Sequence, residues 1–430
     1  MAKKNAIETV EIAQTSKNSF EDIDKAIAKE FDDIIDMSKV DTSVKTWIDS
    51  GVYALNYICS KNLLGAYPFG RVTSIDGLAS TGKSLLAACA MKDPNVDYVL
   101  LLESEGGGSS KELLQFAGVN MEKVRIKKFK TFGNYKINKS NSDIEEVADN
   151  KFPKKKEDEK YIYEEGITRF LKRFINSIRF NGIKKNILII LDSLGNLQSV
   201  REMSGTKDMG AKNIDIGVFF RNFDVDFEKT NIAFIFANKL YTNIGNIYDP
   251  YKASGGVAVE FNPSLGIRLF LTSETDDVTD TEMKSEKERR TSALGSSLKT
   301  IRAKIIKSRF GTEFRNIPFL IDFSMGPARY SGLFTLCSDF GLMKRTGAMY
   351  FMDGVFDKSF YKKDFISLIR ENEASMISRI QTKLEEAEKR IMEGKKEIQT
   401  KDIDVITEET EEEFDSAEMM KAMSRDIEKI

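Results

Sequence analysis

The stretch "IDGLASTGKSLLA", Ile75 to Ala87, places a glycine-rich turn between an apolar run and a segment of helical pattern. Its residues 77–84 fit G-x-x-x-x-G-K-[ST], the pattern of a phosphate-binding loop. Glycines let the backbone wrap an anion, successive N–H groups point inward, and the following helix adds partial positive charge. An ordinary glycine-rich turn is the alternative interpretation. The residues expected to bind ATP are Gly77, Ser80, Thr81, Gly82, Lys83 and Ser84.

Three further polar groups follow apolar runs and complete the predicted nucleotide site. Asp192 ends "ILIILD" and would hold Mg²⁺ together with Ser84, while Lys83 would reach the outer phosphates. Glu105 ends a strand that we expect to neighbour the strand of the phosphate loop, and it is the candidate for activating water. Lys239 ends "NIAFIFANK" and would sense the terminal phosphate. The alternatives are a turn-forming Asp192, a Glu105 that caps a helix or forms a salt bridge in a loop, and a plain strand end at Lys239.

Composition excludes several classes of chemistry. The 430 residues include no histidine, which rules out a Ser-His-Asp triad, a Cys-His dyad and a His-ligated zinc site. The three cysteines lack metal-ligand spacing and cannot form a disulfide framework. No apolar run is long enough to cross a membrane, and the N-terminus has no apolar signal core. We expect a cytoplasmic protein with no membrane partner.

Charge is distributed unevenly along the chain. Residues 402–430 hold 11 acidic and 3 basic side chains, a net charge of −8, although the whole chain has a net charge of −2. The remaining body is therefore mildly basic, at +6. This pattern suits a protein that binds polyanions and whose tail competes for the same surface. A tail that only improves solubility is the alternative.

Short apolar runs alternate with helical segments from Trp47 onward and predict an α/β fold. The runs are continuous, as expected for a central sheet that is mostly parallel and buried on both faces, with antiparallel strands at its end. A short helix is expected at 19–36 in the N-terminal arm, and further helices are expected at 84–92, 166–180 and 217–229. Strands are expected at 71–76, 96–105, 185–192, 231–239, 264–274, 297–309 and 317–324.

The same pattern divides the chain into parts. We expect an N-terminal arm for oligomerisation over 1–45, a nucleotide-binding core over 46–350, a helical region over 351–401 and an acidic tail over 402–430. Residues 127–160 are polar and lysine-rich, which predicts a surface insertion.

Two glycine-rich segments, 199–214 and 240–260, follow predicted strand ends, where open α/β sheets bind their ligands. Their lysines can neutralise DNA phosphates and their tyrosines can stack on bases without reading sequence. Loops that order only against a neighbouring protomer are the alternative. The candidate DNA-binding residues are Lys207, Lys212, Tyr241, Tyr248, Tyr251 and Lys252.

The ordered set of motifs resembles the RecA-type recombinases, and is most similar to the phage UvsX branch. The set comprises the phosphate loop, "ESEGG", "LDSLGNLQS", "ANK", the loop with "SGG", "KSR" at 307–309 and "YSGLFTLCSDFGLM". The resemblance covers about residues 45–350 and implies a RecA-like P-loop ATPase core. Glu103, Leu113 and Glu260 depart from the family, which commonly has aspartate, tyrosine and lysine at these places.

The resemblance also implies roles for particular residues. Lys307 and Arg309 would reach the ATP of a neighbouring subunit and assist Glu105 and Lys83 in catalysis. Phe261 would lie at the interface between subunits, and Lys239 stands where the family has a glutamine sensor. The two glycine-rich segments would be the DNA-binding loops of a filament.

The function that follows is a DNA-dependent ATPase and recombinase. It would form helical filaments on single-stranded DNA, search double-stranded DNA for homology and exchange strands. A mediator that loads it and a single-stranded-DNA-binding protein would be its partners. A hexameric helicase or ring ATPase of the same superfamily, and a coat filament with little ATP turnover, are the alternatives.

Overall fold

The computed structural model describes residues 43–106, 111–205, 210–242, 251–272, 298–323 and 326–410. The fold below concerns the unit that begins at Thr46. The helix expected near residues 19–36 and most of the acidic tail lie outside the described residues.

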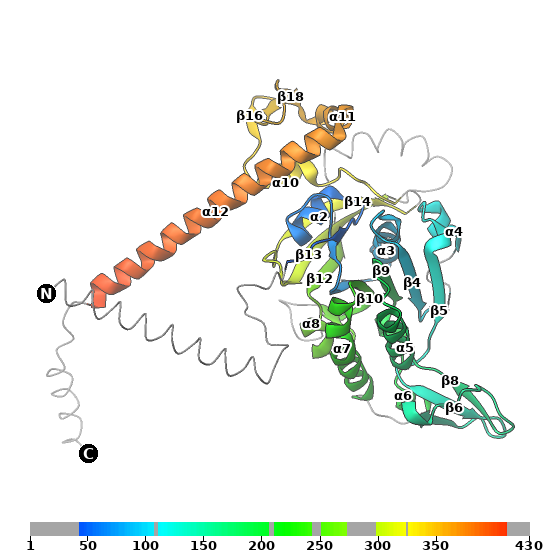
Figure 1. Cartoon of the computed structure of the whole chain (residues 1–430). Helices are drawn as coiled ribbons and strands as arrows, with labels where there is room; N and C mark the ends of the chain where they lie inside the picture. Colours follow the sequence, from blue (N-terminus) through cyan, green and yellow to red (C-terminus); the bar gives the residue numbers. More distant parts are fainter. Residues whose placement is uncertain are drawn as a thin grey trace, which may run out of the picture. The chain divides into compact units, whose positions relative to one another are not determined.

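Ten strands form the central sheet of the described part of the chain (Figure 1). Its order is β15-β14-β13-β12-β3-β10-β9-β4-β5, with β11 paired to β10. The five pairings from β12 to β5 are parallel, whereas β12 to β15 pair antiparallel. The predicted α/β fold, with a mostly parallel sheet and antiparallel strands at its end, is therefore confirmed. The bounds are β3 Val72–Gly77, β4 Tyr98–Glu103, β5 Val124–Lys128, β9 Ile187–Asp192, β10 Ile232–Thr242, β11 Tyr251–Ala253, β12 Leu265–Leu271, β13 Leu298–Ser308, β14 Asn316–Asp322 and β15 Gly326–Pro327.

Helices cover both faces of this sheet. Successive side chains of a strand point to opposite faces, so each strand contributes to the hydrophobic cluster on either side. In β9, Leu188 and Ile190 pack into one cluster with α2 (Tyr53–Ser60) and α3 (Lys83–Lys92). Ile187, Ile189 and Leu191 pack into the other cluster, with α5 (Ile167–Phe180) and α7 (Ala211–Lys229). Every residue of β9 is buried, which explains the continuous apolar run in the sequence.

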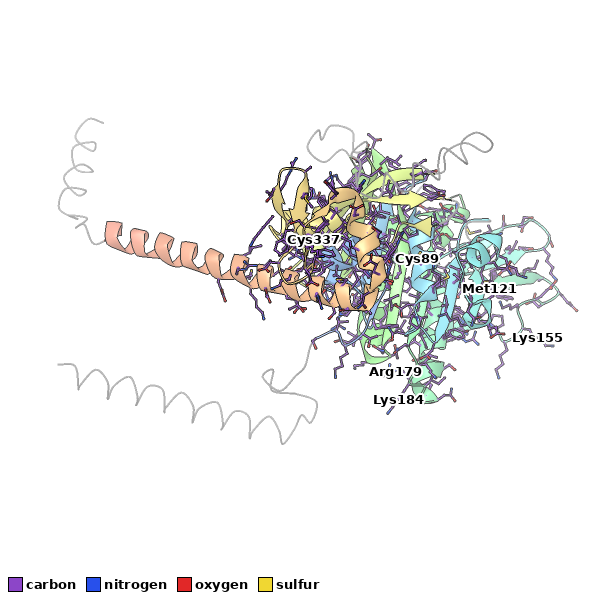
Figure 2. All side chains as sticks on the ribbon, turned by 90° about the horizontal axis from the view of Figure 1, so that it is seen from above. Cys89, Met121, Lys155, Arg179, Lys184 and Cys337 are labelled. Carbon is purple, nitrogen blue, oxygen red and sulfur yellow. The ribbon has the colours of Figure 1, made fainter. Side chains whose placement is uncertain are left out.

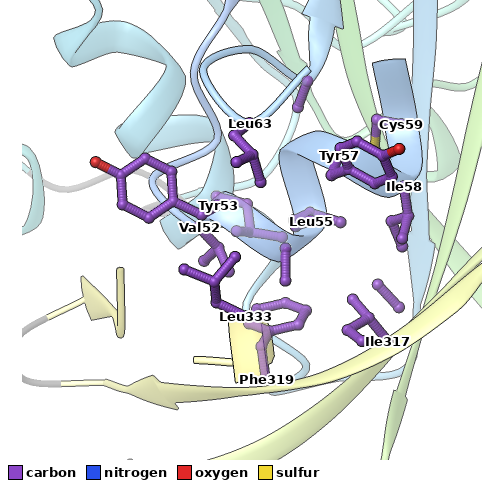
Figure 3. Close-up of a cluster of buried hydrophobic side chains, with 14 of the residues drawn as sticks. Val52, Tyr53, Leu55, Tyr57, Ile58, Cys59, Leu63, Ile317, Phe319 and Leu333 are labelled. Atoms are coloured by element: carbon purple, nitrogen blue, oxygen red, sulfur yellow. The ribbon is translucent and has the colours of Figure 1, made fainter. Parts of the chain in front are cut away.

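The first cluster joins segments that are distant in sequence. Figure 3 shows side chains of α2, such as Leu55 and Ile58, beside Ile317 and Phe319 of β14 and Leu333. Leu333 begins α10 (Leu333–Asp339), and the cluster extends to α11 (Phe365–Glu371) and α12 (Glu373–Thr410). The helical segment after residue 360 thus packs on the core at its start.

The second cluster is rich in phenylalanine. On α7, Phe219, Phe223 and Phe227 are fully buried, and the Phe227 ring lies 5.0 Å from that of Phe234 on β10. The helix begins six residues before the expected start at residue 217. Ala211 and Ile216 are buried in this added stretch, so tertiary contacts support a helix where the sequence is polar.

The lysine-rich insertion forms a small antiparallel sheet together with the residues that directly follow it. Its antiparallel strands are β6 (Asn134–Asn138), β7 (Ile144–Val147) and β8 (Tyr161–Glu164), with β6 in the middle. Lys155, labelled in Figure 2, lies at the periphery of this region. A second small sheet, β16 (Lys344–Thr346), β17 (Met349–Phe351) and β18 (Phe360–Tyr361), precedes α11.

The three cysteines are free thiols in separate elements, and Figure 2 labels Cys89 of α3 and Cys337 of α10. Burial raises the pKa of each thiol. No helix in the described ranges has the length and apolar character needed to span a membrane.

Candidate functional site

The glycine-rich turn lies at the carboxyl end of β3 and leads directly into α3. Gly82 has φ of +87°, and a Cβ there would lie 2.4 Å from Ile321 Cδ1. A Cβ on Gly77 would lie 2.4 Å from Thr81 Oγ1. Position 82 therefore favours glycine for its backbone angle, and a side chain at position 77 would have to displace the Thr81 hydroxyl. Ser80 has a positive φ of 58° in the same turn.

Lys83 folds back over this turn. Its ammonium donates hydrogen bonds to the carbonyl oxygens of Gly77, at 2.9 Å, and Leu78, at 2.7 Å. Burial lowers the pKa of Lys83, and the carboxylates of Asp192 and Glu105 oppose that shift. An ammonium held inside a turn of this shape is a cation placed where an anion would be wrapped.

Asp192 meets Ser84 at the start of α3. Ser84 Oγ donates to Asp192 Oδ2 at 2.9 Å, so two oxygen ligands lie side by side. Burial raises the pKa of Asp192, and the hydrogen bond from Ser84 opposes the shift. Hard oxygen ligands of this kind fit Mg²⁺. In the described residues, no three Asp, Glu or Cys side chains converge as a metal cage, so phosphate and water would supply the other ligands.

Glu105 lies near Asp192, but the predicted position of its strand next to the strand of the phosphate loop is wrong. β4 does not neighbour β3, because β10 and β9 lie between them. Glu105 lies two residues beyond β4, and Ser193 Oγ donates to its Oε1 at 3.1 Å. Glu103 ends β4, is buried and pairs with Lys128 at 3.1 Å. A cavity of about 270 Å³ opens beside Glu105 and is also lined by Glu103 and Glu164.

Lys239 joins Glu105 from β10. Its Nζ lies 2.8 Å from Glu105 Oε1 and donates to Asn196 Oδ1 at 2.9 Å. Burial by itself would raise the pKa of Glu105, but hydrogen bonds from Lys239 and Ser193 outweigh it and hold that pKa below its ordinary value. The carboxylate is therefore kept ionised.

Lys239 does not end its strand, contrary to the sequence prediction. β10 continues to Thr242 because Leu240 to Thr242 pair with β11, and α8 (Val257–Phe261) follows β11. The segment 240–260 is therefore partly regular structure. Ser254, just after β11, donates its N–H to the Lys239 carbonyl and accepts from the Asn238 amide.

The candidate DNA-binding residues are distributed over several environments. Tyr241 and Lys252 lie opposite each other on β10 and β11 and are exposed. Tyr251 instead packs its ring 5.9 Å from that of Phe270. Lys212 is half-buried in α7 and donates to the Gly195 carbonyl at 2.5 Å, and burial lowers its pKa. Lys207 and Tyr248 lie outside the described residues.

The segment 199–214 is likewise not a loop throughout. Val200–Met203 form the short helix α6, capped by Ser199 and Glu202, and α7 begins at Ala211.

Lys307 and Arg309 lie at the opposite end of the sheet from the glycine-rich turn. Ser308 pairs with Leu265, which pairs with Thr73, four positions before Gly77. That separation is on the order of 13 Å along the strand. The Lys307 ammonium lies 5.7 Å from the Phe261 ring centre and also contacts the Phe261 carbonyl. These two cations are therefore remote from the turn of their own chain.

Phe261 is 66% exposed, at the end of α8, and Val257 one turn earlier is 64% exposed. On α7, Asp224 faces the same cations. Burial raises the pKa of Asp224 to about 6, against the opposing effect of Arg309 and Lys307.

Sequence reasoning missed Ser193, Asn196 and Asp76. Ser193 and Asn196 stand within "LDSLGN", the motif that supplied Asp192, so polar residues after the aspartate were the available signal. Asp76 precedes the glycine-rich turn inside β3 and lies between Asn238 on β10 and Arg268 on β12. A carboxylate that is 1% exposed has no signature in a single sequence.

The fold and the site define an α/β protein with a glycine-rich turn, two carboxylates and a lysine at the carboxyl ends of a mostly parallel sheet. No family model matches the sequence. The chain is similar to proteins named Protein RecA. It is 25% identical to that of Phytoplasma mali over 293 residues, 67% of this chain and 71% of the relative.

Two further relatives carry the same name. The chain is 24% identical to Protein RecA of Borrelia hermsii over 297 residues, 67% of this chain and 68% of the relative. It is 25% identical to that of Desulforapulum autotrophicum over 173 residues, 39% of this chain and 45% of the relative. The similarity supports the RecA-type family and leaves the UvsX resemblance a prediction.

Proposed function

We propose that the chain is an ATP-dependent recombinase of the RecA type, closest to the UvsX branch, which forms filaments on single-stranded DNA and exchanges strands with a duplex. One observation carries the proposal. Side chains from four separate segments meet where the glycine-rich turn leads into α3: Ser84 donates to Asp192, Ser193 beside it donates to Glu105, and Glu105 pairs with Lys239. The similarity to RecA proteins supports the same function.

In this proposal, Lys83 exchanges its two backbone carbonyls for the outer phosphates of ATP. Ser84 and Asp192 supply the protein oxygens for Mg²⁺, which when bound neutralises phosphate charge. Glu105 accepts a proton from water as the water oxygen bonds to the terminal phosphorus. The bond to the bridging oxygen breaks, and the products are ADP and inorganic phosphate.

Lys239 links this chemistry to the proposed DNA-binding segments. Its side chain contacts Glu105, and its carbonyl holds Ser254 beyond β11. Displacement of the ammonium toward a phosphate would thus act on both Glu105 and the segment that holds Tyr241 and Lys252. This is how bound ATP would favour the DNA-binding conformation.

Strand exchange between circular single-stranded DNA and a linear duplex tests the proposal. The unaltered chain should exchange strands only with ATP, and Lys83→Ala should lose the activity. Full exchange by Lys83→Ala would refute the assignment. Electron microscopy with an ATP analogue separates the alternatives, because a closed six-membered ring would favour the helicase. Filaments whose ATP turnover is not stimulated by DNA would favour the coat.

Mediator and single-stranded-DNA-binding partners stay predictions of this proposal. Pull-down of such proteins by the filament, compared with the Lys83→Ala chain, is the measurement that bears on them.

A further inference from the structure

Asn196 lies at the centre of the contacts that hold Glu105 and Lys239. It belongs to the single turn η4 (Leu194–Asn196), which directly follows Asp192 and Ser193. Its side-chain oxygen accepts a hydrogen bond from Lys239 Nζ at 2.9 Å, and the same ammonium lies 2.8 Å from Glu105 Oε1. One Lys239 ammonium therefore joins the Asn196 carboxamide to the Glu105 carboxylate, and Asn196 helps to lower the pKa of Glu105.

The side chain at position 196 must accept from an ammonium that also pairs with a carboxylate. The carboxamide of asparagine offers a neutral acceptor, whereas leucine offers none and aspartate would add a second negative charge to compete with Glu105 for Lys239. Lys239 and Ser193 both approach Oε1 of Glu105, at 2.8 and 3.1 Å, so the carboxylate has a defined orientation. A general base depends on such orientation, because proton transfer requires hydrogen-bonding distance and direction.

We propose that Asn196 is a positioning residue for hydrolysis, whose carboxamide holds the Lys239 ammonium and, through it, the Glu105 carboxylate in one fixed arrangement. The inference rests on the proposed function, since it concerns the step in which Glu105 activates water. It goes further by naming a residue that acts on the reaction through Lys239 and Glu105.

The same turn connects to the segment proposed to bind DNA. The carbonyl of Gly195, the neighbour of Asn196, accepts the hydrogen bond of Lys212 at the start of α7. Lys212 is itself a candidate DNA-binding residue, so a contact between its ammonium and a DNA phosphate would compete with its bond to the turn that carries Asn196. The position of Glu105 would then depend on DNA as well as on nucleotide.

ATP hydrolysis by the full-length chain with Mg²⁺ and single-stranded DNA gives the first test. Asn196→Ala should lower kcat about tenfold and leave KM for ATP within about twofold, because orientation and not phosphate binding is lost. Asn196→Gln keeps both hydrogen-bonding groups and should recover most of the rate. Asn181→Ala, at the exposed end of α5, is the matched control and should behave as the unaltered chain.

The inference is overturned if Asn196→Ala keeps its kcat within about twofold, or if KM rises while kcat holds, and equally if Asn196→Gln is no better than Asn196→Ala. A second measurement does not depend on turnover. Thermal unfolding of Asn196→Ala, Lys239→Met and the double variant should show sub-additive losses of Tm, since the two side chains share a hydrogen bond.

Additive losses of Tm would refute the hydrogen bond between Asn196 and Lys239. The two measurements also separate the two proposals. An unaltered chain that hydrolyses no ATP would contradict the proposed function, and the unfolding cycle would still decide whether Asn196 binds Lys239.

Discussion

At the scale of single residues, Glu105 is the group whose loss should separate binding from chemistry. Glu105→Gln keeps the size of the side chain and an oxygen for Ser193 but removes the proton acceptor. We expect ATP hydrolysis to fall about 10² to 10⁴-fold while ATP binding is retained. Initial rates of phosphate release and equilibrium binding of a fluorescent ATP analogue measure the two effects.

Glu164→Gln is the control for that experiment. Glu164 lines the same cavity as Glu105 but is exposed on β8, apart from the Lys239 contacts. It should hydrolyse ATP at the rate of the unaltered chain. A Glu105→Gln variant with undiminished hydrolysis would show that another group activates water.

The buried carboxyl group of Asp76 should make the stability of the fold depend on pH. It is 1% exposed, and its Oδ1 has no hydrogen-bond partner within the described structure. Burial raises the pKa of Asp76 to about 7, with Arg268 opposing the shift. An ordinary aspartate has a pKa of about 3.9, so the folded chain binds this proton more tightly than the unfolded chain. Protonated Asp76 therefore stabilises the folded chain relative to the unfolded chain. This contribution is complete below about pH 4 and is lost as pH rises through about 7.

Asp76→Asn cannot titrate and should therefore flatten this dependence. Between pH 5 and pH 8 the unaltered chain should lose on the order of 2 kcal/mol of unfolding free energy more than the variant. Chemical denaturation at the two pH values measures the difference. Asp357→Asn, with an exposed carboxylate, should keep the slope of the unaltered chain. An equal slope in Asp76→Asn would contradict the assigned burial of that charge.

At the scale of elements, a substitution on α7 measures how much the phenylalanine cluster stabilises the packing of this helix on the sheet. Phe223 is 1% exposed, and its ring lies 5.1 Å from Phe219 and 5.9 Å from Phe227. Phe223→Ala should destabilise the fold by about 3 to 5 kcal/mol, through lost apolar contact and the cavity left behind. Urea unfolding measures the change as a lower midpoint.

Val225 lies two residues further along α7 and is 60% exposed. Val225→Ala is therefore the matched control, and we expect a change within about 0.5 kcal/mol. Similar midpoints for the two variants would mean that α7 does not pack on β10 as the structure has it.

Elements of the fold could be predicted wherever the pattern is local. β9 was predicted because all its residues are apolar up to Asp192, and α5 because its apolar residues recur at helical spacing. The order of the strands was not predictable, since β4 and β3 are separated by β10, a strand from more than a hundred residues later in the chain. The extension of β10 to Thr242 depends equally on a distant partner, β11.

The sequence allowed the residues of the candidate site to be predicted, but not the contacts between them. Ser84, Asp192, Glu105 and Lys239 each follow a strong local pattern, and the structure brings all four to one end of the sheet. The contact of Asn196 with Lys239 could not be predicted. It depends on the register of β9 with β10 and β4, which a single sequence does not give.

At the scale of the whole molecule, the register of the sheet bears on how the chain assembles. Lys307 and Arg309 lie at the end of the sheet opposite to Lys83. Cations that take part in ATP hydrolysis from that position must do so on the nucleotide of another protomer. A head-to-tail contact of this kind is heterologous and generates a filament when it does not close into a ring.

Mixing two inactive variants tests this arrangement. Lys83→Ala lacks the phosphate lysine, and a double variant, Lys307→Ala with Arg309→Ala, lacks the remote cations. In an equal, randomly joined mixture, an intact P-loop from the double variant meets intact cations from Lys83→Ala at about a quarter of the contacts. The mixture should therefore regain DNA-dependent ATP hydrolysis that neither variant has alone. A mixture no more active than its components would place the complete site within one chain, which the strand register of β13 opposes.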